Sequence, residues 1–597
     1  MSKLFNKQYT PSKYQLKIFD FVQKEHGNAV IEAVPGAGKT YTLIQCLKHI
    51  PSNAKVLVAA FNTDIIQELR DKVSKLEEKP NVECRTLHSL GLSILKSNYY
   101  DKANTTPSDY KYTNYIMSYL SDFKKEEYTQ LSKNDKKTYA ENIKTFVDFG
   151  RYYLCKTEND LQKIQDQYSF DCMGSEKKIA LEVMKWGREN IDIIDFTDMV
   201  WLPIVLNCKP YGHLYDWILI DEAQDLEKEE RMLIELCTKM NTRRLFFGEK
   251  KQTINVFKGT DSSTFTSLLK IPNTIKLPLS ITYRCPKSVV RFLHRYNPQI
   301  QAAPNAIEGE VKWHCEVDEI EDGSMVLCRA NAPLMELYSK LSDMGKTAYI
   351  RGKDIGKNLI RLVEGTHEEK INKDLQAKGV FSALYNQLVS VIDDVMRKNR
   401  ISEEMAIEDL NVAQFYDKIM ALDAIAGDCT TVNELTQKIQ LLFSDEKKSG
   451  VILSTVHKAK GLEADNVYIC CPSLLPSKNA KLAWEIESEE NLCYVAYSRS
   501  KVKLGFLKED NMSQYSMTTQ QKLNALQLIK VKVFYLYGNE VRCSGITPTF
   551  DAAKVIIEHS TKIEGFKENV KTVNNVVNNS SFASFKSFGS KKKRKKC

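Results

Sequence analysis

A glycine-rich turn near the start of the sequence carries the residues needed to hold a phosphate. It reads Ala33-Val34-Pro35-Gly36-Ala37-Gly38-Lys39-Thr40-Tyr41 and lies between a short apolar run and a helical stretch at 41–49. Gly36 and Gly38 permit the tight backbone path that points N–H groups at a phosphate. Lys39 would neutralise the β- and γ-phosphates, and Thr40 would bind Mg²⁺. The strand–loop–helix setting favours this interpretation over a chance glycine-rich turn.

A carboxylate motif completes the predicted chemistry. The apolar run Ile218-Leu219-Ile220 ends in Asp221-Glu222-Ala223-Gln224-Asp225. Asp221, at the tip of a buried strand, would hold Mg²⁺ together with Thr40. Glu222 could orient and deprotonate the attacking water. Alone, such an acidic segment would more often be a solvated turn; paired with the phosphate loop, it predicts a nucleoside triphosphatase.

Short β-branched runs alternate with helical stretches along the chain. The predicted strands are 29–31, 56–60, 217–220, 244–247, 325–327, 451–453 and 467–469. Strands that alternate with helices indicate parallel α/β sheets. The strands form two groups, and a charged, strand-poor stretch interrupts each group. We therefore expect two parallel-sheet domains, each with a helical insertion.

The expected domain boundaries follow these composition shifts. The first α/β domain is expected over 1–90 and 191–285, with its insertion at 91–190. The second is expected over 286–360 and 446–508, with its insertion at 361–445. A small C-terminal module is predicted at 509–566, with a strand near 530–536 and a helix near 550–558. The Asn-, Ser- and Lys-rich segment 567–597 is predicted to be a disordered basic tail.

Composition narrows the class of protein. The chain has 597 residues, too many for one hydrophobic core. It contains no apolar run of the ~20 residues that span a bilayer, and its start lacks the apolar segment of a secretory signal. We therefore expect an intracellular protein, cytoplasmic or nuclear, without a membrane partner. The fifteen cysteines lack zinc-site spacing, which predicts reduced thiols.

The net charge of +9 is concentrated at one end of the chain. The six basic residues at 591–596 leave 9 − 6 = +3 for the rest. Nucleic-acid binding would therefore need a local groove and not a uniformly positive surface. The basic tail is compatible with a nuclear-import signal, a DNA-binding arm or a solubilising end, and the sequence leaves the three open.

Further segments complete a recognisable series between about residues 10 and 505. They are Tyr14-Gln15-Leu16, Ala59-Ala60-Phe61-Asn62, Thr86-Leu87-His88, Asp195-Phe196-Thr197-Asp198, Gly248-Glu249-Lys250-Lys251-Gln252, Thr282-Tyr283-Arg284, Val326-Leu327-Cys328-Arg329, Thr455-Val456-His457, Gly461-Leu462-Glu463, and Tyr494-Val495 with Arg499. In order and spacing, the series resembles superfamily 1A DNA helicases of the UvrD/Rep/PcrA type. It also resembles the F-box DNA helicase branch in part.

The resemblance implies roles for these residues around ATP and Mg²⁺. ATP would lie between two RecA-like P-loop motor domains. On the first side, the resemblance implies that Gln15 reads adenine and that the loop from Val34 to Tyr41 surrounds the phosphates. It also implies that Asp221 and Glu222 act in catalysis and that Gln252 senses the γ-phosphate. On the other side it implies Tyr283 stacking on adenine, Arg284 and Arg499 as arginine fingers, and Glu463 near the nucleotide.

The resemblance also implies a single-stranded DNA track. The residues that would contact DNA are Phe61, Asn62, Thr86, His88, Phe257, Lys258, Thr455 and His457. Bases would stack on aromatic side chains while cations hold the phosphates, so the motor should tolerate any sequence. Two departures stand out, because the family usually has Asp at Glu249 and Arg at Lys258. The second insertion also looks shorter than the family's usual one.

The resemblance implies 3′-to-5′ translocation on single-stranded DNA with duplex unwinding, in DNA replication, repair or recombination. The expected partners are single-stranded DNA, single-strand/duplex junctions, and replication or recombination proteins, with the protein itself a monomer. The alternative is a translocase that strips bound proteins and unwinds little, which the two departures and the short insertion motivate. An inactive scaffold is disfavoured because the ATP-site residues are intact.

Overall fold

The computed structural model describes residues 10–547 except 61–62, 78, 100–106, 123–132, 169–171, 173, 254–263, 374–376, 400, 444–448, 510–530 and 538–539. Four of the predicted DNA contacts, Phe61, Asn62, Phe257 and Lys258, lie outside the described residues, as do the predicted helix at 550–558 and the tail. The chain divides into two compact units. Unit 1 is Met1–Val311 with Leu482–Leu504, and unit 2 is Lys312–Lys481 with Gly505–Cys597.

Unit 1 is built on a six-stranded parallel sheet in the order β3-β2-β4-β5-β1-β6. The strands are β1 (Asn28–Ala33), β2 (Lys55–Ala60), β3 (Asn81–Thr86), β4 (Tyr215–Ile220), β5 (Thr238–Gly248) and β6 (Thr274–Leu279). Because all six run the same way, the turns after β1, β4 and β5 meet at one edge of the sheet. The order places β5 between the strand that leads into the phosphate loop and the strand that carries the carboxylates.

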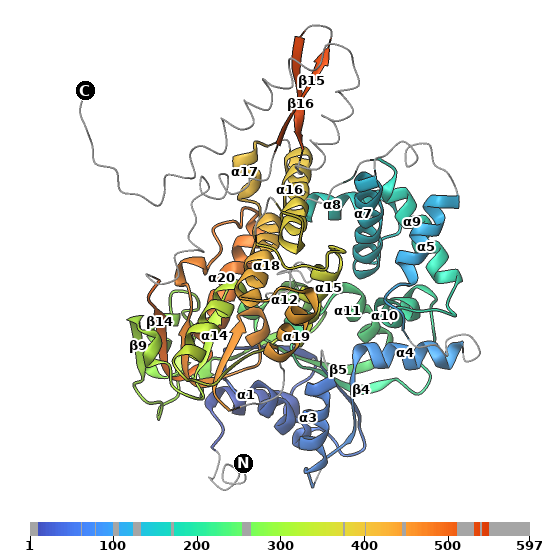
Figure 1. Ribbon diagram of the computed structural model, residues 1–597. Helices are drawn as coiled ribbons and strands as arrows, with labels where there is room; N and C mark the ends of the chain where they lie inside the picture. Colours follow the sequence, from blue (N-terminus) through green and yellow to red (C-terminus); the bar gives the residue numbers. More distant parts are fainter. Residues whose placement is uncertain are drawn as a thin grey trace. The chain divides into compact units, whose positions relative to one another are not determined.

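Helices pack against this sheet, and Figure 1 shows a further group, α5, α7, α8 and α9, gathered side by side in colours from blue to teal. The other helices of unit 1 are α1 (Lys13–Lys24), α2 (Lys39–Cys46), α3 (Thr63–Ser74), α4 (Leu87–Asn98), α10 (Phe196–Val205), α11 (Lys228–Leu236), α12 (Thr264–Leu269), α13 (Lys287–Leu293) and α20 (Ala483–Tyr497). The group comprises α5 (Lys111–Asp122), α7 (Lys133–Tyr152), α8 (Glu158–Tyr168) and α9 (Glu176–Glu189). Two short strands, β7 (Ile281–Thr282) and β8 (Gln301–Ala302), pair beside α13.

Buried ion pairs join that helical group to α10. Lys111 Nζ lies 2.6 Å from an oxygen of Asp198, and Arg151 donates to Asp195 at 2.8 Å and to Asp198 at 3.0 Å. The hydroxyl of Tyr112 also donates to Asp198, at 2.6 Å. Truncating one member would strand a buried charge, so this cluster fixes where the helical group attaches to the sheet domain.

A second six-stranded sheet has the order β11-β12-β10-β13-β14-β9, and its first four strands are parallel and belong to unit 2. The strands are β9 (Glu310–Cys315), β10 (Met325–Cys328), β11 (Ala348–Ile350), β12 (Val451–Thr455), β13 (Ala464–Ile469) and β14 (Ser500–Leu507). Its helices are α14 (Ala332–Asp343), α15 (Lys353–Glu364), α16 (Val380–Asn399), α17 (Glu403–Ile407), α18 (Leu410–Ala426) and α19 (Val432–Leu442). Two RecA-like α/β sheets, as predicted, are therefore present.

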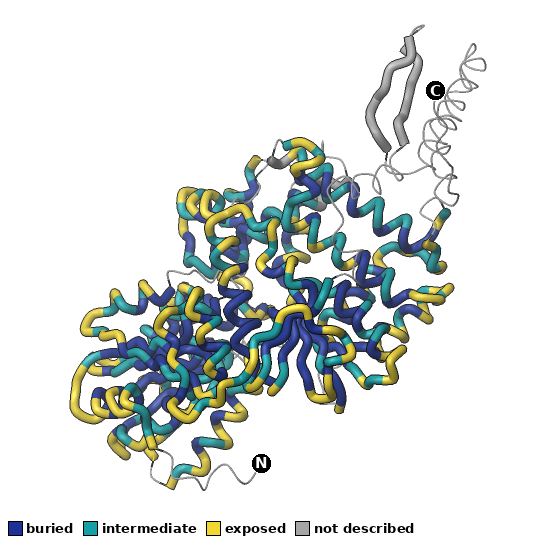
Figure 2. The backbone as a smooth tube through the Cα atoms, turned by 90° about the vertical axis from the view of Figure 1, so that its left-hand side faces the viewer, coloured by how far each residue is buried: buried dark blue, intermediate teal, exposed yellow. Residues whose placement is uncertain are grey.

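All seven predicted strands are confirmed, as β1, β2, β4, β5, β10, β12 and β13. Figure 2 shows the strands mostly in dark blue, consistent with the apolar runs that predicted them. The C-terminal module contains the expected strand, β15 (Val531–Tyr537), but it pairs with a second, unpredicted strand, β16 (Glu540–Thr547). No helix in the described part of the chain has both the length and the apolar composition to cross a membrane.

The described cysteines are free thiols, and most are buried. Only Cys172, in unit 1, and Cys429, in unit 2, are partly exposed among them. Cys328 ends β10 and Cys470 directly follows β13; both are buried and act as small apolar side chains.

Candidate nucleotide-binding site

The glycine-rich turn after β1 has the backbone geometry of a phosphate cradle. Gly36 and Gly38 have φ angles of 67° and 75°, a region that favours glycine. A Cβ on Gly36 would lie 2.4 Å from the Cβ of Arg284, and the N–H of Tyr283 donates to the Gly36 carbonyl at 2.9 Å. The loop therefore packs directly against the segment that carries Arg284.

Lys39, the first residue of α2, faces the two carboxylates at the tip of β4. Its Nζ lies 2.6 Å from Glu222 Oε2 and 3.5 Å from Asp221 Oδ1. Burial acts to lower the pKa of Lys39, but Glu222 and Asp221 more than offset it, so the pKa lies above its usual range. The ammonium is therefore charged at any physiological pH and is positioned to neutralise phosphate oxygens.

Thr40 and Asp221 form a pair of oxygen donors. The Thr40 hydroxyl donates to Asp221 Oδ2 at 2.9 Å, and Asp221 is buried. Burial raises the pKa of Asp221, although Lys39 and the Thr40 hydroxyl act against this shift. Mg²⁺ prefers such hard oxygen ligands and usually keeps waters and phosphate oxygens for its other positions. The two residues therefore fit the magnesium role predicted from the sequence.

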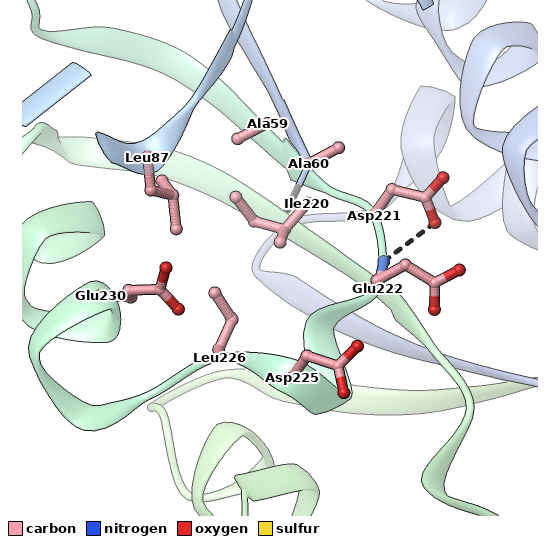
Figure 3. Close-up of a pocket in the computed structure, with 9 residues that line it drawn as sticks. All are labelled: Ala59, Ala60, Leu87, Ile220, Asp221, Glu222, Asp225, Leu226 and Glu230. Atoms are coloured by element: carbon pink, nitrogen blue, oxygen red, sulfur yellow. Dashed lines mark hydrogen bonds between the residues drawn. The ribbon is translucent and has the colours of Figure 1, made fainter. Parts of the chain in front are cut away.

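Glu222 follows Asp221 in an unusual backbone conformation. Its φ is 56° and its ψ is 39°, the left-handed region that a non-glycine residue rarely adopts. Figure 3 shows Asp221 and Glu222 side by side at the tip of β4, where the Glu222 N–H donates to Asp221 Oδ1 at 2.9 Å. This backbone turn directs both carboxylates to the same edge of the sheet, and such strain is typical of functional positions.

Gln224 and Glu249 connect the carboxylates to the turn after β5. Gln224 Nε2 donates to Glu222 Oε2 at 2.7 Å, while Gln224 Oε1 accepts from the Glu249 N–H at 2.9 Å. Gly248 permits this approach, since a Cβ there would lie 2.6 Å from Gln224 Oε1. Burial raises the pKa of Glu249 to about 8, against the opposing effects of Lys39 and Arg499.

Both predicted arginine fingers lie in unit 1. Arg499 is buried at the end of α20, and its Nε donates to the Val495 carbonyl at 2.8 Å. Burial and the like charge of Arg284 lower the pKa of Arg499 to about 10, whereas Glu249 acts to raise it. Arg284 Nη1 contacts the Ser498 carbonyl at 3.4 Å. The charged groups near the phosphate loop are therefore three cations and three carboxylates: Lys39, Arg284, Arg499, Asp221, Glu222 and Glu249.

The expected domain ranges put Arg284 in the first α/β domain and Arg499 in the second, and the closing of both arginines from the other side of the nucleotide stays a prediction. Residues 482–504 belong to unit 1, because α20 packs on the turn η3 (Lys250–Gln252). Asn491 Nδ2 donates to the Thr253 carbonyl at 3.0 Å, which anchors the helix there. The finer division into two sheet domains and two insertions stays a prediction.

Comparison with known families decides the assignment. A model of the UvrD/REP helicase N-terminal domain matches residues 16–272, and a model of the UvrD-like helicase C-terminal domain matches residues 207–510. The chain belongs to the UvrD-like helicase family. The family resemblance predicted from the motif series is therefore confirmed.

The UvrD-like chain is also similar to individual curated proteins. It is 23% identical over 524 residues to F-box DNA helicase protein 1 of Schizosaccharomyces pombe, covering 79% of this chain and 55% of that protein. It is 23% identical over 514 residues to F-box DNA helicase 1 of Gallus gallus, covering 80% and 47%. It is 23% identical over 280 residues to ATP-dependent DNA helicase Rep of Buchnera aphidicola from Acyrthosiphon pisum, covering 44% and 42%. The chain spans about half the length of the relatives it matches.

Gln15, predicted to read adenine, is a buried residue of α1. Its Oε1 accepts from the Ser12 N–H at 2.9 Å, and its Nε2 donates to Thr42 Oγ1 at 3.0 Å. These two bonds fix which end of the amide faces α2. Tyr283 and Tyr41 are exposed on the same unit, as stacking on a base would require.

The remaining predicted residues of this UvrD-like chain divide by unit, and Thr86 and His88 belong to unit 1. Thr86 caps α4 by accepting from the Ser89 N–H at 3.1 Å, and His88 Nδ1 lies 4.0 Å from Glu230. Figure 3 shows Glu230 across a small pocket from Asp221, with Leu87 on its wall. Three others belong to unit 2 and are not part of the unit 1 cluster: Thr455, His457 and Glu463.

Two residues of the cluster were not predicted as site residues. They are Gln224 and Glu249, whose contacts join the loops after β4 and β5. The sequence held one signal for them, because Gln224 lies two residues after Glu222 and Gly248 precedes Glu249. Only the strand order, which places β5 beside β4, reveals that the two loops meet.

Proposed function

We propose that this protein is an ATP-dependent DNA helicase that translocates 3′ to 5′ on single-stranded DNA and unwinds duplex. The observation that carries the proposal is the convergence of Lys39, Asp221, Glu222, Arg284 and Arg499 at one edge of the first sheet. Opposed cations and a carboxylate base are what phosphoryl transfer to water requires. The family membership supports DNA as the track, with the polarity taken from the family resemblance.

The proposed roles in hydrolysis combine this geometry with the family resemblance. Lys39 and the N–H groups of the loop from Val34 to Tyr41 hold the phosphates. Glu222 accepts a proton from the attacking water, and Gln252 orients the γ-phosphate. Arg284 and Arg499 balance the charge that develops on it. Mg²⁺, held by Thr40 and Asp221, would supply positive charge on the β- and γ-phosphate oxygens.

The proposed roles in recognition complete the motor. Gln15 reads adenine, Tyr283 stacks on it, and Glu463 contributes to ATP binding. DNA contacts are assigned to Phe61, Asn62, Thr86, His88, Phe257, Lys258, Thr455 and His457. The track is single-stranded DNA or a single-strand/duplex junction, and the setting is replication, repair or recombination inside the cell.

Two assays test this function. ATP hydrolysis should rise when single-stranded DNA is added, and rise less with RNA of the same length. Strand displacement should then proceed from duplexes with a 3′ tail, while duplexes that open only from a 5′ tail would overturn the polarity. Displacement of a recombinase filament without duplex unwinding would favour the alternative, a translocase that strips bound proteins.

A further inference from the structure

An aromatic cluster in the helical group of unit 1 contacts the first turn of helix α20. Phe149 lies in α7, Tyr153 directly follows α7, and Tyr168 ends α8. The ring centroid of Phe149 is 5.0 Å from that of Tyr168 and 6.4 Å from that of Tyr153, and the two tyrosine hydroxyls share a hydrogen bond. Trp484 of α20 packs edge-on against Tyr168, with the ring centroids 6.0 Å apart. The cluster is therefore the surface on which the start of α20 rests.

Packing alone holds the Trp484 side chain. The indole is partly buried and packs on the hydrophobic core of unit 1 that contains Tyr168. Its Nε1 is buried and makes no hydrogen bond with any residue that the structure describes. The chain enters unit 1 at Leu482, so this indole fixes α20 within its first residues there. An aromatic ring at position 484 is what the contact requires, and the indole N–H is not.

Helix α20 is held a second time near its middle, and Arg499 lies just beyond its end. Asn491 Nδ2 donates to the Thr253 carbonyl at 3.0 Å. Trp484 lies seven residues before Asn491 and Arg499 eight residues after it. At 1.5 Å per residue these are arms of about 10 and 12 Å. If the first turn came loose, the helix could tilt about Asn491, and Arg499 would shift by about as much as Trp484.

The same cluster also contacts the helix that follows the two carboxylates. Lys228 begins α11, six residues after Glu222. Its Nζ donates to the carbonyl of Tyr153 at 3.0 Å. The helical group thus contacts both α20, which leads to Arg499, and α11, which follows the proposed catalytic base.

We infer that Trp484 is a positioning residue, which sets Arg499 at the nucleotide by seating α20 on the aromatic cluster of the helical group. The inference rests on the proposed ATP hydrolysis and deepens it, because it names what holds one arginine finger in place. Trp484 acts through Arg499 and needs no contact with the nucleotide. Its loss therefore lowers the rate of hydrolysis and leaves ATP binding nearly unchanged.

The helical group supplies a matched control. Trp186 of α9 is also a partly buried indole of unit 1, and it stacks on Tyr115 of α5 with the ring centroids 3.7 Å apart. Trp484→Leu and Trp186→Leu each remove one indole, so both should lower the melting temperature. Only Trp484→Leu frees α20. A general loosening of unit 1 would lower hydrolysis in both variants alike.

The test is steady-state ATP hydrolysis by the full chain with saturating single-stranded DNA. Trp484→Leu should lower kcat at least tenfold, because a shift of about 1 Å in a catalytic group can cost on the order of 10²-fold. The KM for ATP should change less than twofold. Trp484→Phe should stay within threefold of the wild-type kcat, since a phenyl ring keeps the edge-on contact. Trp186→Leu should stay within twofold.

A double variant shows whether Trp484 acts through the arginine finger. In an Arg499→Ala background, Trp484→Leu should lower kcat less than twofold further, because the group that it positions is already gone. A merely structural tryptophan would lower kcat by the same factor in both backgrounds.

The inference is wrong if Trp186→Leu loses as much kcat as Trp484→Leu, or if Trp484→Phe is as slow as the leucine variant. A tenfold loss that persists in the Arg499→Ala background also contradicts it. Should Trp484→Leu fail to fold, Trp484→Met takes its place, since methionine fills irregular space but offers no ring. It should lower kcat in the same way, and a normal kcat would overturn the inference. A wild type without DNA-stimulated hydrolysis would instead refute the proposed function.

Discussion

Replacing Lys39 by alanine should separate the folding role of this lysine from its catalytic role. Its Nζ lies 2.6 Å from Glu222, and the two side chains are 13% and 22% exposed. Breaking such a buried pair leaves a stranded carboxylate and costs about 3 kcal/mol, the lower end for buried pairs, because Glu222 retains some solvent contact. In a unit of this size that cost lowers the melting temperature by about 6 °C.

The assay is thermal unfolding without nucleotide, alongside ATP hydrolysis. Lys39→Ala should melt early and hydrolyse no ATP. Lys39→Ala combined with Glu222→Gln removes one of the two carboxylate charges that Lys39 faces and leaves that of Asp221, so its melting temperature should recover in part while hydrolysis stays absent. Lys24→Ala is the matched control, because its ion pair with Asp20 spans 2.7 Å but is exposed, and exposed pairs contribute little.

Three results would refute this reasoning. The first is a Lys39→Ala protein that melts at the wild-type temperature, since the ion pair would then contribute nothing. The second is a double variant that melts lower than Lys39→Ala alone. The third is hydrolysis at the wild-type rate by Lys39→Ala, which would remove this lysine from the nucleotide site altogether.

Further predictions follow from the same site. Glu222→Gln should bind ATP, measured by fluorescent-nucleotide titration, but stall its turnover. Arg284→Ala and Arg499→Ala should each lower kcat on the order of 10³-fold, and wild-type turnover in either would remove it from the mechanism. Gly36→Ala should prevent ATP binding, because its Cβ would lie 2.4 Å from the Arg284 Cβ in a backbone region that disfavours alanine. Burial raises the folded-state pKa of Glu249 to about 8, so stability should fall as the pH rises from about 4.5 to about 8. Glu249→Gln should reduce that fall, and an equal change of melting temperature between pH 5 and pH 8.5 in the variant and the wild type would mean that this carboxyl titrates normally.

The strands that sequence analysis predicted are those buried on both faces. In the first sheet, the two strands it missed are β3 and β6, the edges of the sheet. β3 carries Asn81, Glu83 and Arg85, and β6 contains Pro278, which an edge strand tolerates because one side needs no ladder bond. In the first sheet, continuous apolar runs therefore predict the central strands, whereas the polar sequences of the edge strands resemble loops.

The phosphate loop and the carboxylates were predictable because each motif is local and follows its own strand. The contact between Gln224 and Glu249 was not, because it depends on β5 lying between β4 and β1. The place of Arg499 was also beyond the sequence, since the motif order does not say against which loop α20 packs. One bond in that packing comes from the amide of Asn491, a residue outside the predicted motifs.

The positions of the partly exposed cysteines allow fluorescent dyes to be attached to each unit of this protein. Cys172 and Cys429 are the two described cysteines that a maleimide dye can reach, and they belong to different units. With Cys543 and Cys597 replaced by serine, a donor and an acceptor dye could be attached without introducing new cysteines. Single-molecule energy transfer between the two dyes would then report whether the distance between the units changes when ATP is added.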